Sequence, residues 1–283
     1  MVGGLFGRHR PGLRGDDMTD ITHRGSDGCP LYAVSIGAGP TVFLLHGGGP
    51  DHRSLVSLAG LLADRYRVVL PDVRGYGRSV CADPALHTWS RYADDVVALM
   101  DHLGLAGAAV GGTGMGGTIA LRAAAAHSER VQAALVISLE DIEDDAGKQA
   151  EAEMLERFAA RVRSSGLGAA WSDLLPSLAP VIGNLVREAI PRADPASIVA
   201  ACAIGRDRAF RTVDDLKAIT VPTLIVPGAD ARHPGELAAL AVQALPQGEL
   251  APAAPFDTVE TAEELGHALA PALRAFLESR IPA

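Results

Sequence analysis

The stretch Gly-Thr-Gly-Met-Gly at residues 112–116 joins a short apolar run, Gly107–Gly112, to an amphipathic helical pattern, Met115–His127. In a strand-to-helix turn of this form, the central residue is held in a strained conformation above the end of the strand. The residues two before and two after the centre must be small, because the strand and helix backbones pack closely there. The two outer glycines meet this need, so the stretch predicts a sheet strand, a tight turn centred on Gly114 and a helix.

The central position of this turn carries no nucleophile. Turns of this kind present a serine in many hydrolytic enzymes, but Gly114 has no side chain. Moving the centre to Thr113 would place Met115 two residues further on, where its bulk clashes. It would also force a β-branched residue into a positive φ, which such residues tolerate poorly. We therefore predict the turn without the nucleophile.

Short apolar runs alternate with helical patterns along the chain, which is typical of a parallel sheet wrapped by helices. The predicted strands are Leu31–Ile36, Thr41–Leu45, Tyr66–Leu70, Ala108–Gly112, Val131–Ser138, Thr223–Val226 and Glu249–Ala251. The predicted helices are Leu55–Asp64, Trp89–Leu103, Met115–His127, Pro234–Ala244 and Ala262–Ser279. Between Leu139 and Leu216 the strand pattern stops and apolar residues recur at helical spacing. We predict a mostly parallel, doubly wound α/β sheet over residues 18–138 and 217–283, with a helical insertion at 139–216.

Composition and charge exclude several classes of function. The chain has 283 residues, of which 48% are hydrophobic, and a net charge of −9 at pH 7. Its only two lysines are Lys148 and Lys217, so the basic footprint that nucleic-acid binding requires is missing. The three cysteines are too far apart in sequence for a zinc motif or a dense disulfide framework. We expect a cytoplasmic protein that binds no nucleic acid, no metal and no cofactor.

The hydropathy along the chain predicts no membrane association, because no apolar run is long enough to span a bilayer. Residues 1–17 are rich in glycine and arginine and lack the apolar segment of a signal peptide. We expect these residues to form a disordered leader, with folded sequence beginning at Met18. The sequence leaves the oligomeric state open.

Four segments in a fixed order resemble the α/β-hydrolase superfamily, specifically its proline-iminopeptidase and haloperoxidase-like branch. They are His46-Gly47-Gly48-Gly49-Pro50, Pro71-Asp72-Val73-Arg74-Gly75-Tyr76-Gly77-Arg78-Ser79, the turn ending Met115-Gly116-Gly117, and Val221-Pro222-Thr223-Leu224-Ile225-Val226-Pro227-Gly228. The resemblance covers about Thr19 to Leu277. It implies the α/β-hydrolase fold, and it identifies the helical insertion with the family's cap domain.

The same resemblance implies where a catalytic triad would lie. The family orders its triad as serine, then an acid, then histidine. The acid position, three residues past Gly228, is Ala231, and the histidine position, counted back from Glu263-Glu264-Leu265, is Pro255. With Gly114 at the serine position, all three triad positions are degenerate.

Five side chains remain as candidates for acid–base chemistry: His52, His233, Glu140, Asp141 and Asp230. Glu140 and Asp141 follow the strand Val131–Ser138, where some family members carry their acid. They also suit the acidic first turn of a helix, and we prefer this interpretation. Asp230 lies one residue from the acid position, and we prefer for it the role of an aspartate that caps a turn.

The histidines differ in their expected positions. His233 could turn toward the pocket, although a place in the loop before Pro234 is the simpler interpretation. His52 follows the His-Gly-Gly-Gly loop and is our first choice for acid–base work, because this segment can face the pocket entrance. A surface position at the start of the next helix is the open alternative for His52. We expect His46 to orient the glycine loop.

The resemblance also implies a backbone oxyanion hole that survives the loss of side chains. Its donors would be the amides of Gly48 and Met115, and the helix that begins at Met115 adds the positive end of its dipole. Hydrolases stripped of triad residues keep roughly 10³–10⁴-fold catalysis over water from such a hole and from binding. That is too little for useful hydrolysis of esters or amides, but it suits easier reactions of activated substrates.

We therefore expect a small carbonyl or carboxylate ligand, bound under the cap, with lyase-, isomerase- or cyclase-like chemistry or with no catalysis. Two alternatives stay open. One is a hydrolase in which relocated residues activate water in the space that Gly114 leaves. The other is a scaffolding pseudoenzyme.

Overall fold

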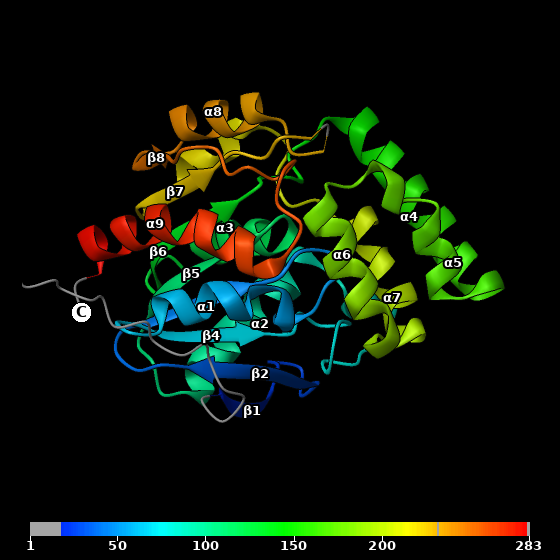
Figure 1. The fold of residues 1–283 in the computed structure, drawn as a ribbon, viewed down its shortest axis with the longest axis horizontal. Coiled ribbons are helices and arrows are strands. Elements are labelled where there is room, and N and C mark those ends of the chain that lie inside the picture. Colours follow the sequence, from blue (N-terminus) through cyan, green and yellow to red (C-terminus); the bar gives the residue numbers. More distant parts are fainter. Residues whose placement is uncertain (1–17, 231, 282–283) are drawn as a thin grey trace, which may run out of the picture.

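The computed structural model describes residues 18–230 and 232–281 (Figure 1). The predicted leader, residues 1–17, and the predicted acid position, Ala231, lie outside the described residues.

The core of the fold is an eight-stranded sheet. Its strands are β1 (Met18–Arg24), β2 (Pro30–Ile36), β3 (Thr41–Leu45), β4 (Arg67–Pro71), β5 (Ala108–Thr113), β6 (Val131–Ile137), β7 (Thr223–Val226) and β8 (Gly248–Leu250). They lie in the order β1-β2-β4-β3-β5-β6-β7-β8. Strand β2 pairs antiparallel with β1 and β4, and the remaining neighbours pair in parallel. The predicted fold class, a mostly parallel doubly wound sheet, is confirmed.

Strand β1 is the one sheet element that the sequence patterns did not predict. Its sequence, Met-Thr-Asp-Ile-Thr-His-Arg, buries only Ile21 and His23, at alternate positions. An edge strand of this kind has a single partner and faces solvent along its other side, so it lacks the apolar run that marks the central strands.

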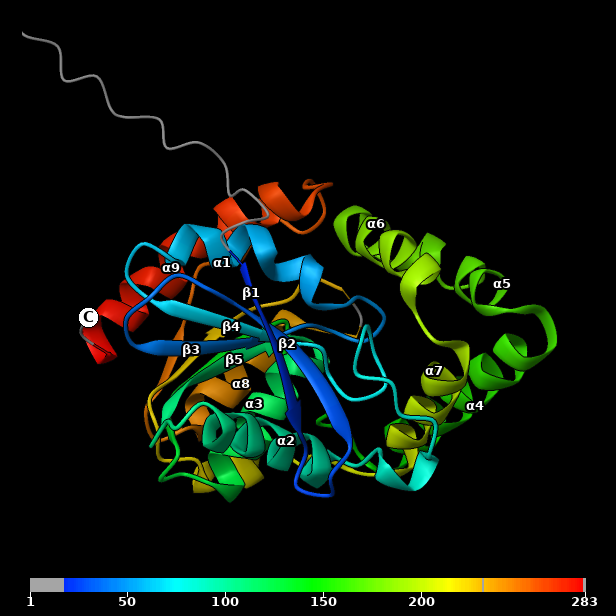
Figure 2. The same ribbon diagram turned by 90° about the horizontal axis from the view of Figure 1, so that it is seen from below.

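Helices cover both faces of the sheet. Helices α1 (Val56–Leu62) and α9 (Ala262–Arg280) pack on one face, and α2 (Trp89–His102), α3 (Met115–Ala126) and α8 (Gly235–Ala244) pack on the other. Figure 2, which looks along the layers, shows α1 and α9 on the side of the sheet opposite α2 and α3. Each face has its own buried apolar cluster, as expected for a sheet that is covered on both sides.

Residues 138–222 connect β6 to β7, and the helical insertion predicted at 139–216 lies within this segment. It contains α4 (Asp145–Ser165), α5 (Leu167–Ser172), α6 (Pro180–Ala189) and α7 (Pro195–Ala201), which gather beside one end of the sheet (Figures 1 and 2). These helices have an apolar cluster of their own around Phe158, Leu167 and Ile198. The β contact recorded within the insertion is one isolated bridge between Ile142 and Phe210.

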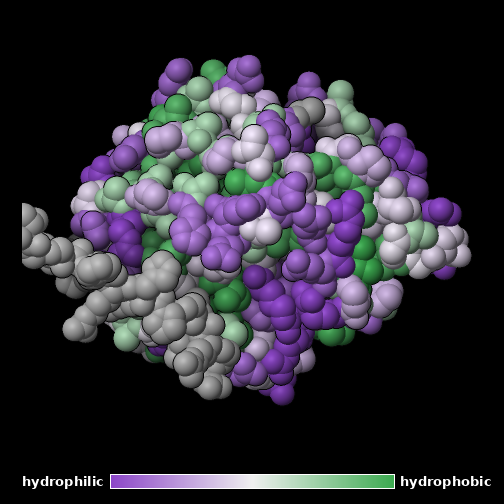
Figure 3. All heavy atoms as spheres, viewed as in Figure 1, coloured by the Kyte–Doolittle hydropathy of each residue, from purple (hydrophilic) through white to green (hydrophobic). Residues whose placement is uncertain are grey.

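The surface gives no sign of a membrane-spanning element. Hydrophilic and hydrophobic residues are interspersed over the face shown in Figure 3. Among residues 18–230 and 232–281, no helix has both the length and the apolar character that crossing a bilayer requires.

Candidate functional site

The glycine turn has the geometry that its sequence predicted. Gly114 has φ 50° and ψ −120°, and it lies directly between β5 and the first residue of α3. Both outer glycines are required: a Cβ on Gly112 would lie 2.4 Å, and one on Gly116 2.2 Å, from the carbonyl oxygen of Leu45. Any side chain at either position would therefore clash with the backbone of β3.

Glu140 lies beside the turn, at the place where a side chain of residue 114 would begin. A Cβ built on Gly114 would be 2.9 Å from Oε1 of Glu140. Two non-glycine residues with positive φ flank this segment, Ser138 at 60° and Asp141 at 64°. Such conformations are uncommon and cost energy, and they cluster at functional sites. Here they turn the chain at the end of β6 so that the carboxylate of Glu140 faces the turn.

The prediction that Glu140 and Asp141 form the first turn of a helix is wrong. Helix α4 begins at Asp145, and its N-cap is Asp144, whose side chain accepts a hydrogen bond from the Gly147 amide at 2.8 Å. Glu140 and Asp141 precede the helix and are buried. The positive φ of Asp141 is incompatible with a right-handed helix, and a sequence pattern of acidic residues does not reveal it.

His233 completes the group above Gly114. Its Nε2 atom lies 3.2 Å from Oε2 of Glu140 and 3.5 Å from the position of a Cβ on Gly114. Its Nδ1 atom lies 2.8 Å from Oδ1 of Asp230, which also accepts hydrogen bonds from the amides of Arg232 and His233, each at 2.9 Å. Asp230 thus caps the turn, as we preferred, and at the same time orients the histidine ring.

The charges in this group stabilise one another. Burial alone would lower the pKa of His233, but hydrogen bonding to Glu140 and the charges of Glu140 and Asp230 raise it above its ordinary value. Burial alone would raise the pKa of Glu140, but the charge of Arg232 and the hydrogen bond from His233 lower it to about 2. These contacts favour the protonated ring over the neutral one, because an imidazolium can donate from both nitrogens, one to each carboxylate.

Arg232 belongs to the same group, and the sequence analysis missed it. Its Nε donates to Oε2 of Glu140, and its Nη2 lies 3.0 Å from Oε1 of Glu151 and 3.8 Å from Oδ1 of Asp141. Burial and the charge of Glu140 raise the pKa of Asp141 well above its ordinary value. No local signal in the sequence distinguishes Arg232 from any other loop arginine, because its partners lie far away along the chain.

The glycine loop after β3 lies next to the turn. His46 is fully buried, and its Nε2 accepts a hydrogen bond from the Val73 amide at 3.0 Å while its Nδ1 lies 2.8 Å from the Gly47 carbonyl oxygen. These two bonds require the neutral ring with its proton on Nδ1, so His46 orients the loop, as expected. A Cβ on Gly47 would lie 3.3 Å from the Thr113 carbonyl oxygen, whereas one on Gly48 would meet nothing within 4 Å. Gly48 therefore borders open space close to the turn.

The helical insertion reaches over this loop. A Cβ on Gly49 would lie 2.8 Å from the indole of Trp171, in α5, and 3.1 Å from the side chain of Val186, in α6. Arg192 follows α6 and places its Nε 2.9 Å from Oδ2 of Asp51, whose side chain is almost completely buried. Apolar contact and a partly buried ion pair thus hold the insertion against the loop.

His52, our first choice for acid–base work, is not brought to this group. It is buried, with Nδ1 2.8 Å from Oδ1 of Asp72 and its ring centre 5.5 Å from that of Tyr32. Its own amide also donates to Oδ1 of Asp72 at 2.9 Å. His52 therefore lies neither at a pocket entrance nor on the surface at the start of a helix, the two positions predicted for it. Asp72 compensates the burial of the polar ring, and this pairing could not be foreseen from their spacing in the sequence.

Pro255 is exposed, in a turn where its carbonyl oxygen accepts hydrogen bonds from the amides of Thr258 and Val259. The position that the resemblance assigns to a catalytic histidine thus carries a residue that stabilises a turn.

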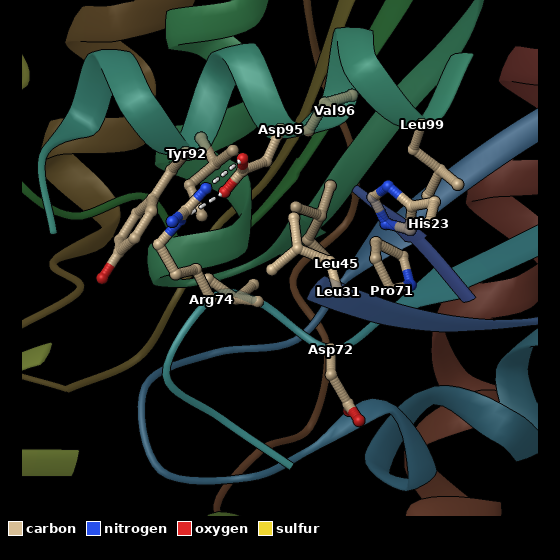
Figure 4. A pocket seen from close by; sticks show the side chains of 12 residues that line it. His23, Leu31, Leu45, Pro71, Asp72, Arg74, Tyr92, Asp95, Val96 and Leu99 are labelled. Carbon is tan, nitrogen blue, oxygen red and sulfur yellow. Dashed lines mark hydrogen bonds and ion pairs between the residues drawn. The ribbon is translucent and has the colours of Figure 1, made fainter. Parts of the chain in front are cut away.

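Two cavities lie away from Gly114. One, of about 20 Å³, has room for roughly one water molecule and is lined by His23, Asp95 and Arg74 among others (Figure 4). There the buried Arg74 guanidinium donates to both oxygens of Asp95, at 2.7 and 2.8 Å. The other, of about 230 Å³, is open and lies between α6 and the start of α9. Gly114, Glu140 and His233 line neither of them.

Comparison with known proteins places this geometry in a family. Residues 42–278 match the alpha/beta hydrolase family. An epoxide hydrolase from Caballeronia sordidicola is 34% identical over 120 residues, which are 40% of this chain and 35% of that protein. The chain thus spans well under two thirds of the length of the first curated relatives that it matches.

Solved structures match over most of their length. A thermophilic esterase from Thermogutta terrifontis has a TM-score of 0.75 and 27% identity, over 91% of this chain and 99% of that one. A bottromycin epimerase, solved with bottromycin A2, has a TM-score of 0.69 and 24% identity over 91% of this chain and 98% of its own, a likeness of fold alone. Because the family match extends over most of the sequence, the chain belongs to the alpha/beta hydrolase family.

Proposed function

We propose that this chain binds a small carbonyl or carboxylate ligand above Gly114, beneath the helical insertion acting as a cap, and transfers a proton without a covalent intermediate. The reaction is of the isomerase, lyase or cyclase kind. The observation that carries the proposal is the position of a carboxylate and an imidazole beside the turn: a Cβ on Gly114 would lie 2.9 Å from Oε1 of Glu140 and 3.5 Å from Nε2 of His233. The space that a nucleophile would need is bordered by an acid–base pair.

The proposal also holds that this chain lacks catalytic residues at all three positions of the family's triad. Gly114 offers no nucleophile, and the acid and histidine positions that the family resemblance implies are Ala231 and Pro255. Our placement of the chain in the proline-iminopeptidase and haloperoxidase-like branch rests on the motifs alone. For a member of that branch, the loss of the catalytic side chains at all three positions argues against a mechanism through an acyl-enzyme.

In the proposed chemistry, backbone amides bind the ligand oxygen and His233 transfers the proton. The ligand oxygen accepts hydrogen bonds from the amides of Gly48 and Met115, at the positive end of α3, where charge develops as a proton leaves the neighbouring carbon. The neutral form of His233, reached when the imidazolium releases its Nε2 proton to solvent, keeps its other proton on Nδ1 toward Asp230 and accepts the proton from the carbon at Nε2. The electron pair left on the carbon forms an enolate. The imidazolium then returns a proton to the carbon. Glu140 is too weak a base for the transfer, and it holds the imidazolium in place.

A second candidate function is water activation. Several relatives are named as hydrolases, among them the epoxide hydrolase and putative carbamate hydrolases of Caulobacter. A water molecule beside Gly114 would lie near both Glu140 and His233, and the neutral histidine would take its proton as it attacks. The bottromycin epimerase, by contrast, is a non-hydrolytic enzyme on this fold, and its existence supports the first candidate. A scaffolding role is the third possibility.

One experiment separates the three. A panel of ketones, thioesters, esters and epoxides is incubated with the protein in D₂O, and deuterium entering the carbon next to the carbonyl is followed by NMR. A parallel incubation in H₂¹⁸O detects hydrolysis by mass spectrometry. Proton exchange that His233→Asn abolishes, and that His267→Asn on the exposed face of α9 leaves unchanged, supports the proposal. Incorporation of ¹⁸O supports water activation, and the absence of both, with no ligand-induced rise in Tm, supports the scaffolding role.

A further inference from the structure

We infer that Arg232 is a positioning residue for the pair formed by Glu140 and His233, and that it ties this pair to helix α4 of the insertion. The inference rests on the proposed function, because it assigns Arg232 a role in maintaining the proposed acid–base pair.

The guanidinium of Arg232 bridges two parts of the fold. On one side its Nε donates to Oε2 of Glu140, the oxygen that His233 also contacts. On the other side its Nη2 lies 3.0 Å from Oε1 of Glu151, in the second turn of α4. The loop that carries His233 is therefore joined to the insertion through one side chain, and the planar fork of arginine suits such a double contact.

The other groups around Glu140 do not replace this contact. His233 is cationic only while it is protonated, and Asp141 adds acidity rather than positive charge. The phenol of Tyr76 interacts electrostatically with this group and stays neutral, because burial raises its pKa. Lys148 is occupied by Glu151 at 2.7 Å and Glu143 at 3.5 Å. Among the described residues, Arg232 is the permanent cation that contacts Glu140.

The charge of Glu140 in turn influences the protonation state of His233. A buried carboxylate that loses its cationic partner becomes protonated more readily, because burial penalises the charged form. Once Glu140 is protonated it carries no negative charge, so it no longer stabilises the positive charge of the His233 imidazolium. Arg232 thus keeps the pair charged through its contact with Glu140.

The test is a titration, which needs no substrate. Protein labelled with ¹³C in its glutamate carboxyl groups and histidine rings is titrated by NMR, with Glu140→Gln and His233→Asn to assign the two signals. In the natural protein we expect Glu140 to remain ionised throughout the pH range in which the fold persists. In Arg232→Met we expect the pKa of Glu140 to rise by about 1–3 units, the usual effect of removing an adjacent opposite charge.

Two variants are the controls. Glu151→Gln removes the contact of Arg232 with α4 and leaves its contact with Glu140, so the pKa of Glu140 should stay low while amide exchange in the first turns of α4 becomes faster. Arg232→Lys keeps the positive charge and should also keep the pKa of Glu140 low. It serves as the test of the charge if Arg232→Met fails to fold.

A folded Arg232→Met variant in which Glu140 keeps its low pKa would overturn the inference, and so would an Arg232→Lys variant in which that pKa rises as it does in Arg232→Met. Neither result bears on whether His233 transfers protons. Conversely, a failure to detect exchange or hydrolysis would remove the proposed function and leave the titration result standing.

Discussion

Nε2 of His233 lies 3.2 Å from Oε2 of Glu140, directly beside Gly114 in the turn between β5 and α3. This relationship joins the loop after β7 to the loop after β6, both at the carboxyl ends of parallel strands. Open α/β sheets bind ligands at this edge, so the pair lies where the fold places its chemistry.

Gly114→Ala should destabilise the protein more than Gly104→Ala. Both glycines have positive φ, 50° and 67°, so both variants bear the backbone strain of about 1–3 kcal/mol. Only at position 114 would the new methyl group also meet a neighbour, Oε1 of Glu140 at 2.9 Å. Urea unfolding at equilibrium measures the difference. Equal losses of stability would mean that Glu140 moves aside freely.

Fluorophosphonate probes should not label the protein, because they trap activated serines and Gly114 has no hydroxyl group. Gly114→Ser should not create turnover of p-nitrophenyl esters at neutral pH, because the positions that the family resemblance assigns to the acid and the histidine are Ala231 and Pro255, and the new side chain crowds the carboxylate of Glu140. Intact-mass measurement and an ester assay check both statements. Robust turnover by this single variant would show that Asp230 and His233 form a working acid–base pair for a serine.

Stability should decrease at acidic pH in a way that depends on Glu140. Its pKa is lowered from 4.5 to about 2 in the folded protein, so its ionised form contributes stability above pH 4.5. That contribution is lost as the pH falls from 4.5 toward about 2. Urea unfolding at a series of pH values should show a shallower decrease for Glu140→Gln than for the natural protein. Parallel curves for the two proteins would contradict the ionised state of Glu140.

His52→Ala and His233→Asn should have opposite consequences. His52 is buried against Asp72, and removing one partner of a buried pair costs about 3–5 kcal/mol, less whatever Asp72 retains from its backbone donors. We expect a large loss of stability in His52→Ala and little change in the titration of Glu140. In His233→Asn we expect little loss of stability and the loss of any proton exchange. Thermal unfolding and the deuterium assay measure the two effects, and exchange that survives in His233→Asn would point to another base.

The fold could be predicted because its signals are local. The strands and helices follow from apolar periodicity, and the turn follows from the steric need for small residues at Gly112 and Gly116, which the contacts with Leu45 bear out. Strand β1 was missed because an edge strand with two buried positions carries a weak signal. The capping role of Asp230 could be predicted because its signal is also local. Its partners are the amides of Arg232 and His233, which follow it in the same loop.

The site could not be predicted to the same degree. Glu140 was assigned to a helix because four nearby acidic residues suit a helix start, and the left-handed turn at Asp141 that separates it from α4 has no sequence signal of its own. His52 was preferred to His233 on its place after the glycine loop, and only its contact with Asp72 shows that its ring is already engaged.

The parallel sheet, the glycine turn and the lack of a side chain at Gly114 can be read from the sequence, because each depends on a few neighbouring residues and their backbone sterics. The neighbours of that glycine, by contrast, depend on how the strands are arranged in the sheet. Arg232 and Glu140 are 92 residues apart along the chain and meet because β6 and β7 are adjacent in the sheet and end at the same edge. The strand order brings those charges together, and the burial of Glu140 then strengthens their pairing, which no spacing in the sequence expresses.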